Sequence, residues 1–370
     1  MAKKEAKRKV IKIGSALLAA EDGALRIKWL NSLADDVAKK IKSGYEIIVV
    51  SSGAVALGRN KLGIKRKELK LEEKQAAAAC GQVELMTAWQ ETFRRHKVEV
   101  AQVLLTISDT EDRRRYLNAR NTIETLIGRG IIPIVNENDT VATSEIRYGD
   151  NDRLAARVAQ MVTADNLILF SDIDGLYTAN PRTDKKAKHV AEVKKITDKI
   201  RKMADGKGSF TSSGGMITKI EAASMASSAG ITTIVTTGIV ANPLKKLENG
   251  GRKTVFLAEG SPEKARKNWL RTSLKTEGEV IIDDGARKAL IKGNSLLPAG
   301  VKKIKGVFRR GDAILIKNSS GKEVGRGLAA YSAEEAQKIM GKNTSEIKKI
   351  LGFVGREELI HRNDMVLAEK

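Results

Sequence analysis

The chain has 370 residues, more than one typical domain, and its composition (41% hydrophobic, 30% charged, 5 prolines) excludes widespread disorder. Lysine and arginine outnumber aspartate and glutamate by 67 to 45, and the net charge of +22 fits either a lysine-rich background or attraction to RNA and anionic substrates. One cysteine and three dispersed histidines exclude a disulfide framework and predict no cysteine-rich or histidine-based metal site.

The N-terminal segment predicts no secretory signal. The apolar stretch after the basic start is interrupted by Lys12 and Gly14 and then reaches Glu21 and Asp22. No apolar run approaches the ~20 residues that a membrane span requires. We therefore expect a cytoplasmic protein with no membrane partner.

Between residues 8 and 258, apolar β-rich runs alternate with helical patterns. The expected strands are 9–14, 46–51, 98–105, 131–136, 166–171 and 231–236. The expected helices are 27–43, 75–95, 111–129, 151–163, 192–204 and 218–229. Because the strands are apolar throughout, they favour a parallel sheet that is covered on both faces. The pattern predicts an α/β, three-layer αβα domain with a mostly parallel central sheet over 8–258.

The pattern changes after residue 258. A charged and irregular stretch over 259–276 is expected to be a linker. Short strands at 279–283, 297–301, 304–308, 312–317 and 322–330, with one helix at 332–340, follow it. They predict a small, mainly β domain over 277–356 and a tail over 357–370.

Four expected strands end in loops that are rich in glycine and short polar residues. These loops are Lys12-Ile13-Gly14-Ser15, Ser51-Ser52-Gly53-Ala54, Asn136-Glu137-Asn138-Asp139 and Ser171-Asp172-Ile173-Asp174-Gly175. One such loop is usually an ordinary turn. Parallel strands bring their carboxyl ends to one edge of the sheet, so four together predict the rim of an active site.

The Walker and dinucleotide fingerprints are absent, so phosphate binding must depend on other loops. Lys12 before Gly14 combines a positive charge with approachable backbone N–H groups. The glycine turn that starts at Ser213 enters a helix with Lys219 in its first turns, which favours an anion. The stretch 136–153 crowds amides and carboxylates that suit an amine and a carboxylate, although an Asp or Asn opening a helix is also an ordinary N-cap.

Together these motifs resemble the amino acid kinase family over nearly all of 9–258. The motifs are VIKIGSALL (10–18), SSGAVALGRNKLG (51–63), QAAAACGQ (75–82), RRRYLNARNT (113–122), PIVNENDTVAT (133–143), YGDNDRLAARVA (148–159), SDIDGLYTANPR (171–182) and GGMITK (214–219). Residues 278–355 resemble a PUA domain, an RNA-binding fold in other proteins, through VIIDDGARKAL, GNSLLPAGV and RRGD.

The resemblance implies a phosphotransferase that moves the γ-phosphoryl group of ATP to the γ-carboxylate of L-glutamate, the first step of proline biosynthesis. It implies Mg²⁺, a homo-oligomer (dimer or tetramer) and feedback inhibition by proline. RNA binding by the PUA-like domain stays open.

The resemblance also implies roles for individual residues. Lys12 and Lys219 match two catalytic lysines, and Asp152 matches the acid that orients them. The glutamate-binding positions are Ser52, Gly53, Asp139 and Asn151. The nucleotide-binding positions are Lys12, Gly14, Ser171, Asp172, Ser213, Gly214, Gly215, Met216, Ile217, Thr218 and Lys219.

The sequence departs from the family pattern at two places. Ser212-Ser213 stands where the family usually has Gly-Thr, and Ile107 follows Thr106 where arginine is common. The serines retain a hydroxyl, so we expect nucleotide binding to persist.

Two alternative functions stay open. One is a member of the same family that acts on another carboxylate, a carbamate or a nucleoside monophosphate. The other is an RNA-binding protein that uses the basic cluster 302–310. An aromatic content of 4% is poor for base stacking and disfavours the second.

Overall fold

The computed structural model describes residues 7–20, 23–64, 69–141, 151–204, 215–272, 276–353 and 355–368. The chain divides into two compact units, which are Met1–Glu111 with Asn118–Pro262 (unit 1) and Asp112–Leu117 with Glu263–Lys370 (unit 2). Within the described ranges, no helix has both the length and the apolar character needed to cross a membrane.

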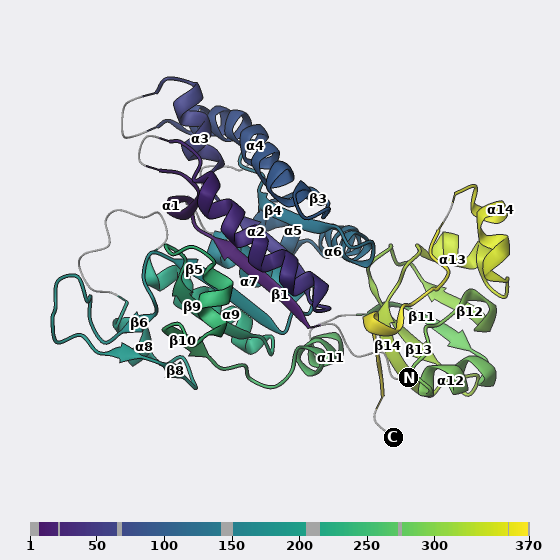
Figure 1. The fold of residues 1–370 in the computed structure, drawn as a ribbon. Helices are drawn as coiled ribbons and strands as arrows, with labels where there is room; N and C mark the ends of the chain where they lie inside the picture. Colours follow the sequence, from purple (N-terminus) through teal and green to yellow (C-terminus); the bar gives the residue numbers. More distant parts are fainter. Residues whose placement is uncertain are drawn as a thin grey trace. The chain divides into compact units, whose positions relative to one another are not determined.

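An eight-stranded sheet forms the centre of unit 1 (Figure 1). The strand order is β3-β4-β2-β1-β5-β9-β10-β8. The bounds are β1 (Arg8–Ile13), β2 (Glu46–Ser51), β3 (Val100–Leu105), β4 (Ile132–Glu137), β5 (Asn166–Ser171), β8 (Glu192–Val193), β9 (Thr232–Thr237) and β10 (Lys253–Phe256). The six strands from β3 to β9 in this order are mutually parallel, and β10 runs antiparallel to β9. The prediction of a mostly parallel sheet is confirmed.

Strand β1 lies at the point where the strand order reverses. It pairs with β2 on one side and with β5 on the other, both in parallel register. The loops that follow these three strands therefore leave the sheet at neighbouring positions on the same edge. In open α/β sheets the crevice at such a point is where ligands bind.

Helices cover the sheet on both faces. They are α1 (Ser15–Leu18), α2 (Ile27–Lys42), α3 (Ala54–Lys61), α4 (Leu71–Arg94), α5 (Ile107–Glu111), α6 (Arg113–Gly128), α7 (Asn151–Met161), α8 (Asp198–Lys202), α9 (Met216–Ser228) and α10 (Pro243–Glu248). Ile11 and Ile13 of β1 pack with Leu33 of α2 and Trp89 of α4. Because side chains alternate along a strand, Lys12 faces the other side, where α7 and α9 lie. The three-layer prediction is confirmed.

Two segments of unit 1 differ from the sequence expectation. Residues 192–204 were expected to form one helix, but they contain the two-residue strand β8 and the short helix α8. A small antiparallel pair, β6 (Leu176–Tyr177) and β7 (His189–Val190), adds to this region. These strands are too short to show a hydrophobic period in the sequence.

Unit 2 contains a five-stranded sheet with the order β12-β11-β13-β14-β15. Its strands are β11 (Thr276–Ile282), β12 (Val301–Gly306), β13 (Ala313–Lys317), β14 (Glu323–Leu328) and β15 (Met365–Leu367). Its helices are α11 (Pro262–Thr272), α12 (Asp284–Ile291), α13 (Ala333–Ile339) and α14 (Ile347–Leu351), with short 3₁₀ turns at Pro298–Gly300, Thr344–Glu346 and Arg362–Asp364. Val280, Ile282, Ile314 and Ile316 anchor its buried core.

The expected linker 259–276 is largely helix α11. The high charge of this stretch made it look irregular in the sequence. In the structure, Arg266 forms a largely buried ion pair with Asp364, and Leu270 is buried. The expected tail 357–370 contributes β15, which pairs antiparallel with β14. A Cβ at Gly325 would collide with the Val366 carbonyl oxygen, so a glycine allows this strand to approach.

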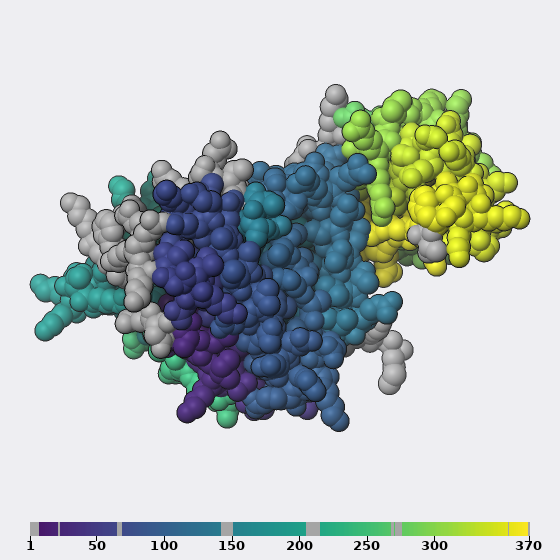
Figure 2. Space-filling model, turned by 90° about the horizontal axis from the view of Figure 1, so that it is seen from above, coloured from purple at the N-terminus to yellow at the C-terminus, as the bar shows by residue number. Residues whose placement is uncertain are grey.

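Helices α3 and α4 cross in unusually close contact. A Cβ at Gly58 would overlap the carbonyl oxygen of Ala77, and a Cβ at Gly81 would overlap that of Ala54. Helix α4 belongs to the blue segments that form much of the face of unit 1 seen in Figure 2. The two glycines let the backbones touch, and this contact sets the position of α3.

We expect Gly81→Ala to lower the free energy of unfolding by more than about 2 kcal/mol, because the methyl group meets backbone that cannot move aside. Gly128→Ala is the matched control, since this helical glycine has nothing within 4 Å of its Cβ position. It should be neutral or stabilising by about 0.5–1 kcal/mol. Urea denaturation measures both, and equal effects would contradict the close-contact argument.

Candidate functional site

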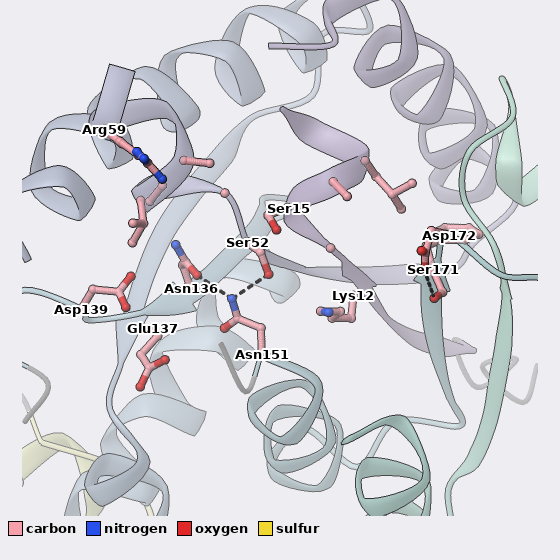
Figure 3. A pocket seen from close by; sticks show the side chains of 18 of the residues that line it. Lys12, Ser15, Ser52, Arg59, Asn136, Glu137, Asp139, Asn151, Ser171 and Asp172 are labelled. Atoms are coloured by element: carbon pink, nitrogen blue, oxygen red, sulfur yellow. Dashed lines mark hydrogen bonds between the residues drawn. The ribbon is translucent and has the colours of Figure 1, made fainter. Parts of the chain in front are cut away.

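A cavity of about 300 Å³ opens in unit 1 where the loops after β1, β2, β4 and β5 meet. It is lined by nine residues that the sequence singled out: Lys12, Gly14, Ser52, Gly53, Asp139, Asn151, Ser171, Asp172 and Lys219. In Figure 3, Arg59 and Asp139 lie at one end, Ser171 and Asp172 lie at the other, and Lys12 and Asn151 lie between them. The structure brings these residues together, and their individual roles stay predictions.

A buried ion triad lies beside the cavity. The Lys12 Nζ of β1 lies 2.7 Å from Asp152 Oδ1 of α7, and the Lys219 Nζ of α9 lies 3.1 Å from Asp152 Oδ2. Thr218 donates a further hydrogen bond of 2.8 Å to the same oxygen. The three charged side chains are 1–8% exposed. The triad carries a net charge of +1, and both of its lysines line the cavity.

The triad keeps Asp152 ionised. Burial alone would raise the pKa of this carboxyl, but Coulombic attraction to Lys12 and Lys219, with hydrogen bonds from Lys12 and Thr218, holds the pKa well below its usual range. The ionised carboxylate in turn fixes both ammonium groups. Asp152 itself does not line the cavity, so its action there is exerted through the lysines.

A chain of hydrogen-bonded amide side chains forms another part of the cavity wall. Asn151 Nδ2 donates to Ser52 Oγ at 2.8 Å and to Asn136 Oδ1 at 3.1 Å. Asn151 is 7% exposed, and its Oδ1 has no hydrogen-bond partner. Buried polar atoms are usually paired, so an unpartnered acceptor at a cavity is suited to a donor from a ligand.

Asp139 is the acid at the Arg59 end of the cavity. Burial raises the pKa of its carboxyl to about 6. A cationic ligand beside Asp139 would therefore stabilise the ionised form of its carboxylate. Arg59 extends from α3 and donates from Nε to the carbonyl oxygen of Ile64 at 2.9 Å.

The other end of the cavity is open and polar. Ser171 donates to Asp172 at 3.1 Å, and Arg182 pairs with Asp172 at 2.8 Å. Burial would raise the pKa of Asp172, but the hydrogen bonds from Arg182 and Ser171 lower it. At Gly14, a Cβ would lie 3.8 Å from the Lys12 ammonium, so the absence of a side chain leaves backbone accessible beside that charge.

Several predicted nucleotide positions are not among the residues that line the cavity. Gly215 precedes α9, and Met216, Ile217 and Thr218 form its first turn. Ser213 and Gly214 lie outside the described residues.

Arg59, Glu137 and Leu69 also line the cavity, and the sequence predicted no role for any of them. Arg59 lies inside the motif SSGAVALGRNKLG and Glu137 inside PIVNENDTVAT. A lining position on α3 follows only from the crossing of α3 and α4, which a local pattern does not show.

No cluster of three His, Cys, Asp or Glu side chains suited to a metal ion occurs among the described residues. Asp152, the most buried acid at the site, is already paired with two lysines. The described residues therefore fit a divalent cation that is carried by a phosphate ligand, since Mg²⁺ usually binds through one or two carboxylates plus phosphates and waters.

Comparison with known protein families agrees with this geometry. The model of the amino acid kinase family matches residues 7–237, and the PUA domain model matches residues 278–351. The chain belongs to the amino acid kinase family. The cavity, the ion triad and the parallel sheet all lie within the matched kinase segment.

Close relatives of this family member cover almost the whole chain. A protein of Paramagnetospirillum magneticum called glutamate 5-kinase is 56% identical over 98% of both chains. A glutamate 5-kinase of Agrobacterium fabrum is 55% identical over 97% of this chain and 92% of its own length. The crystal structure of a UMP kinase from Ureaplasma parvum, at 16% identity and a TM-score of 0.50, covers 68% of this chain and 99% of its own, and it shows the shared fold.

Removal of the Asp152 charge tests the triad. Asp152→Asn preserves shape but leaves two buried ammonium groups without their counter-ion, so we expect the free energy of unfolding at pH 7 to fall by about 3 kcal/mol or more. Because folding lowers the Asp152 pKa, the wild-type contribution is present above the ordinary carboxyl pKa and is lost as pH falls through the lowered one. The difference between the two proteins should therefore persist from pH 8 to pH 5.

Asp172→Asn is the control, because the Asp172–Arg182 pair is exposed and should contribute less than about 1 kcal/mol. Urea denaturation in phosphate-free buffer measures both variants. A loss for Asp152→Asn no larger than that for Asp172→Asn would contradict the role of the triad.

Proposed function

We propose that the protein is a glutamate 5-kinase, which transfers the γ-phosphoryl group of ATP to the γ-carboxylate of L-glutamate and gives L-glutamate 5-phosphate and ADP, the first step of proline biosynthesis. The observation that carries the proposal is the identity of 56% over 98% of the chain to a protein of that name. The cavity supports it, because two lysines, the half-buried Asp139 and a hydrogen-bonded pair of amides line it together.

The reaction needs no strong base. The γ-carboxylate is ionised at neutral pH, so one of its oxygens forms a bond to the γ-phosphorus while the bond from phosphorus to the β,γ-bridging oxygen breaks. The electron pair of that bond leaves on ADP, and no proton has to be removed from the nucleophile. The obstacle is the repulsion between two anions, so catalysis depends on positioning and on stabilisation of charge.

The ion triad is suited to this task. Lys12 and Lys219 are the catalytic lysines in our proposal, and they stabilise the negative charge on the transferred phosphoryl oxygens and on the leaving oxygen. Asp152 holds both ammonium groups in place through contacts of 2.7 and 3.1 Å. Fixed charges in a site that excludes water stabilise a transition state without the cost of reorganisation.

L-glutamate would bind beside Asp139 and the amide chain. In this proposal Asp139 and the unpartnered Asn151 oxygen accept hydrogen bonds from the α-ammonium group, because both are acceptors at a largely buried wall. Ser52 and the backbone at Gly53 supply donors for carboxylate oxygens.

The nucleotide would lie toward Ser171 and Asp172, with its phosphates near Gly14, Lys12 and the first turn of α9. Mg²⁺ bound to the phosphates neutralises part of their charge when the substrate is present. A dimer or tetramer, proline feedback, RNA binding by the PUA unit and a cytoplasmic location stay predictions.

The decisive assay measures ADP release from Mg-ATP with a panel of acceptors, with hydroxylamine present to trap an acyl phosphate. We expect a hydroxamate that depends on L-glutamate and matches ADP in amount. ADP release with a carbamate, a nucleoside monophosphate or another carboxylate, and not with glutamate, would overturn the substrate assignment.

Lys12→Met and Lys219→Met should each lower kcat by ~10²–10³-fold, the usual loss when one preorganised stabilising group is removed. Each variant leaves Asp152 paired with the other lysine, so the fold should be retained. Lys246→Met, at an exposed lysine of α10, is the control and should turn over normally. Near-normal kcat in either cavity variant would remove that lysine from the mechanism.

The raised pKa of Asp139 predicts how the KM for glutamate depends on pH. With a pKa of about 6, Asp139 is mostly ionised at pH 7.5 and mostly protonated at pH 5.5, so KM for glutamate should rise about fourfold over that interval as pH falls. Asp139→Asn should raise KM at pH 7.5 and abolish this dependence.

The same substitution should not destabilise the protein, because a raised carboxyl pKa means that ionisation costs folding free energy at neutral pH. Steady-state kinetics between pH 5.5 and 7.5 test the assignment. An unchanged pH profile in Asp139→Asn would show that another group titrates.

A further inference from the structure

Gln82 lies behind the wall of the cavity and extends the amide chain. It belongs to α4, and its Oε1 accepts a hydrogen bond of 2.8 Å from Asn136 Nδ2. Asn136 Oδ1 then accepts from Asn151 Nδ2, which also donates to Ser52 Oγ. Gln82 does not line the cavity, so it can act on a ligand only through these neighbours.

The chain of hydrogen bonds has a direction. A primary amide has an oxygen on one side and an NH₂ group on the other, and each link needs a donor to meet an acceptor. Because Gln82 offers oxygen, Asn136 must turn its NH₂ toward α4 and its oxygen toward Asn151. Asn151 must then turn its NH₂ toward Asn136 and Ser52, which leaves its oxygen without a partner, on the side of Glu137 in Figure 3.

The two ends of this chain are the atoms that have no partner. Gln82 Nε2 is a buried donor and Asn151 Oδ1 is a buried acceptor, and neither makes a hydrogen bond. With the reverse direction, Asn151 would present NH₂ to the cavity instead. The direction of this chain thus decides whether Asn151 offers an acceptor or a donor to a ligand.

We infer that Gln82 is a positioning residue that makes the cavity selective for an acceptor substrate with an α-ammonium group. The inference rests on the proposed function and explains how this site distinguishes L-glutamate from the same dicarboxylate without its amine. Ser52 accepts the bond from Asn151 and so keeps its hydroxyl proton for a carboxylate oxygen. The chain therefore offers one acceptor and one donor side by side, which matches a zwitterionic amino acid.

The experiment compares L-glutamate with glutarate, which lacks the amine. In wild-type protein, the ratio of kcat/KM for glutamate over glutarate measures recognition of the ammonium group. Gln82→Met is similar in length and offers neither donor nor acceptor. It should lower this ratio about tenfold or more through KM for glutamate, with KM for ATP unchanged.

Two further variants separate direction from packing. Gln82→Glu keeps an acceptor for Asn136 and should restore the ratio to within about threefold of wild type. Asn136→Asp presents acceptors on both sides, so Asn151 keeps its direction whatever residue 82 offers, and adding Gln82→Met should then change the ratio little. Such loss of additivity is the signature of a shared network.

Gln90→Met, the same substitution at an exposed position of α4, is the control and should leave the ratio unchanged. The inference is overturned if Gln82→Met leaves the ratio intact, if Gln82→Glu is as impaired as Gln82→Met, or if the loss persists in the Asn136→Asp background.

Calorimetric titration of glutamate and glutarate into each protein provides the same ratio without turnover. If wild-type protein binds glutamate selectively but does not phosphorylate it, and Gln82→Met loses that selectivity, the proposed function fails and the inference stands. If wild-type protein phosphorylates glutamate and Gln82→Met retains full selectivity, only the inference fails. If it binds neither ligand, both fail.

Discussion

The site depends on one carboxylate held between two lysines. Asp152 is 1% exposed, and burial of three charges without mutual pairing would cost several kcal/mol for each ion. The triad therefore requires contacts of 2.7 and 3.1 Å and a hydroxyl from Thr218. Its members come from β1, α7 and α9, so the ion triad forms only when the sheet and both helices on that face have packed. The charge centre consequently exists only in the packed kinase unit.

The sequence predicted this sheet well because its strands are long apolar runs. Strand β1 is buried on both faces, because Ile11 and Ile13 pack against α2 and α4 while Val10 on the opposite face is also fully buried. Such apolar strands differ clearly from amphipathic helices. The short elements were missed for the opposite reason. Strand β8 has two residues and β15 has three, and both form because a neighbouring strand is available rather than through local preference. Helix α11 was predicted to be a linker because many of its residues are charged. The sequence does not show that one of them, Arg266, pairs with Asp364.

The site was predictable to the extent that it sits at strand ends. Lys12, Ser52, Asp139 and Ser171 lie at or just after the carboxyl ends of separate strands, and parallel pairing alone brings them to one edge. The contribution of Gln82 was not predictable in this way. It stands in mid-helix on α4, reaches Asn136 across 54 positions of sequence, and is placed by the packing of α4 against the sheet. A local motif contains no information about a contact of that kind.

In the proposed function, the lysines and the amides of the cavity recognise different groups by different physics. Phosphoryl groups carry diffuse negative charge, and a fixed net charge of +1 attracts them whatever their orientation. An α-amino acid has to be distinguished from molecules of the same charge and length, for which direction matters more than charge. Neutral amides in a hydrogen-bonded chain provide direction without adding another buried ion, and a site that leaves an acceptor unpaired penalises any ligand lacking the donor. The raised pKa of Asp139 shows that ionising a carboxyl at this site already costs free energy, and a further buried anion would add to that cost. Neutral amides avoid that cost and add no charge near the ion triad.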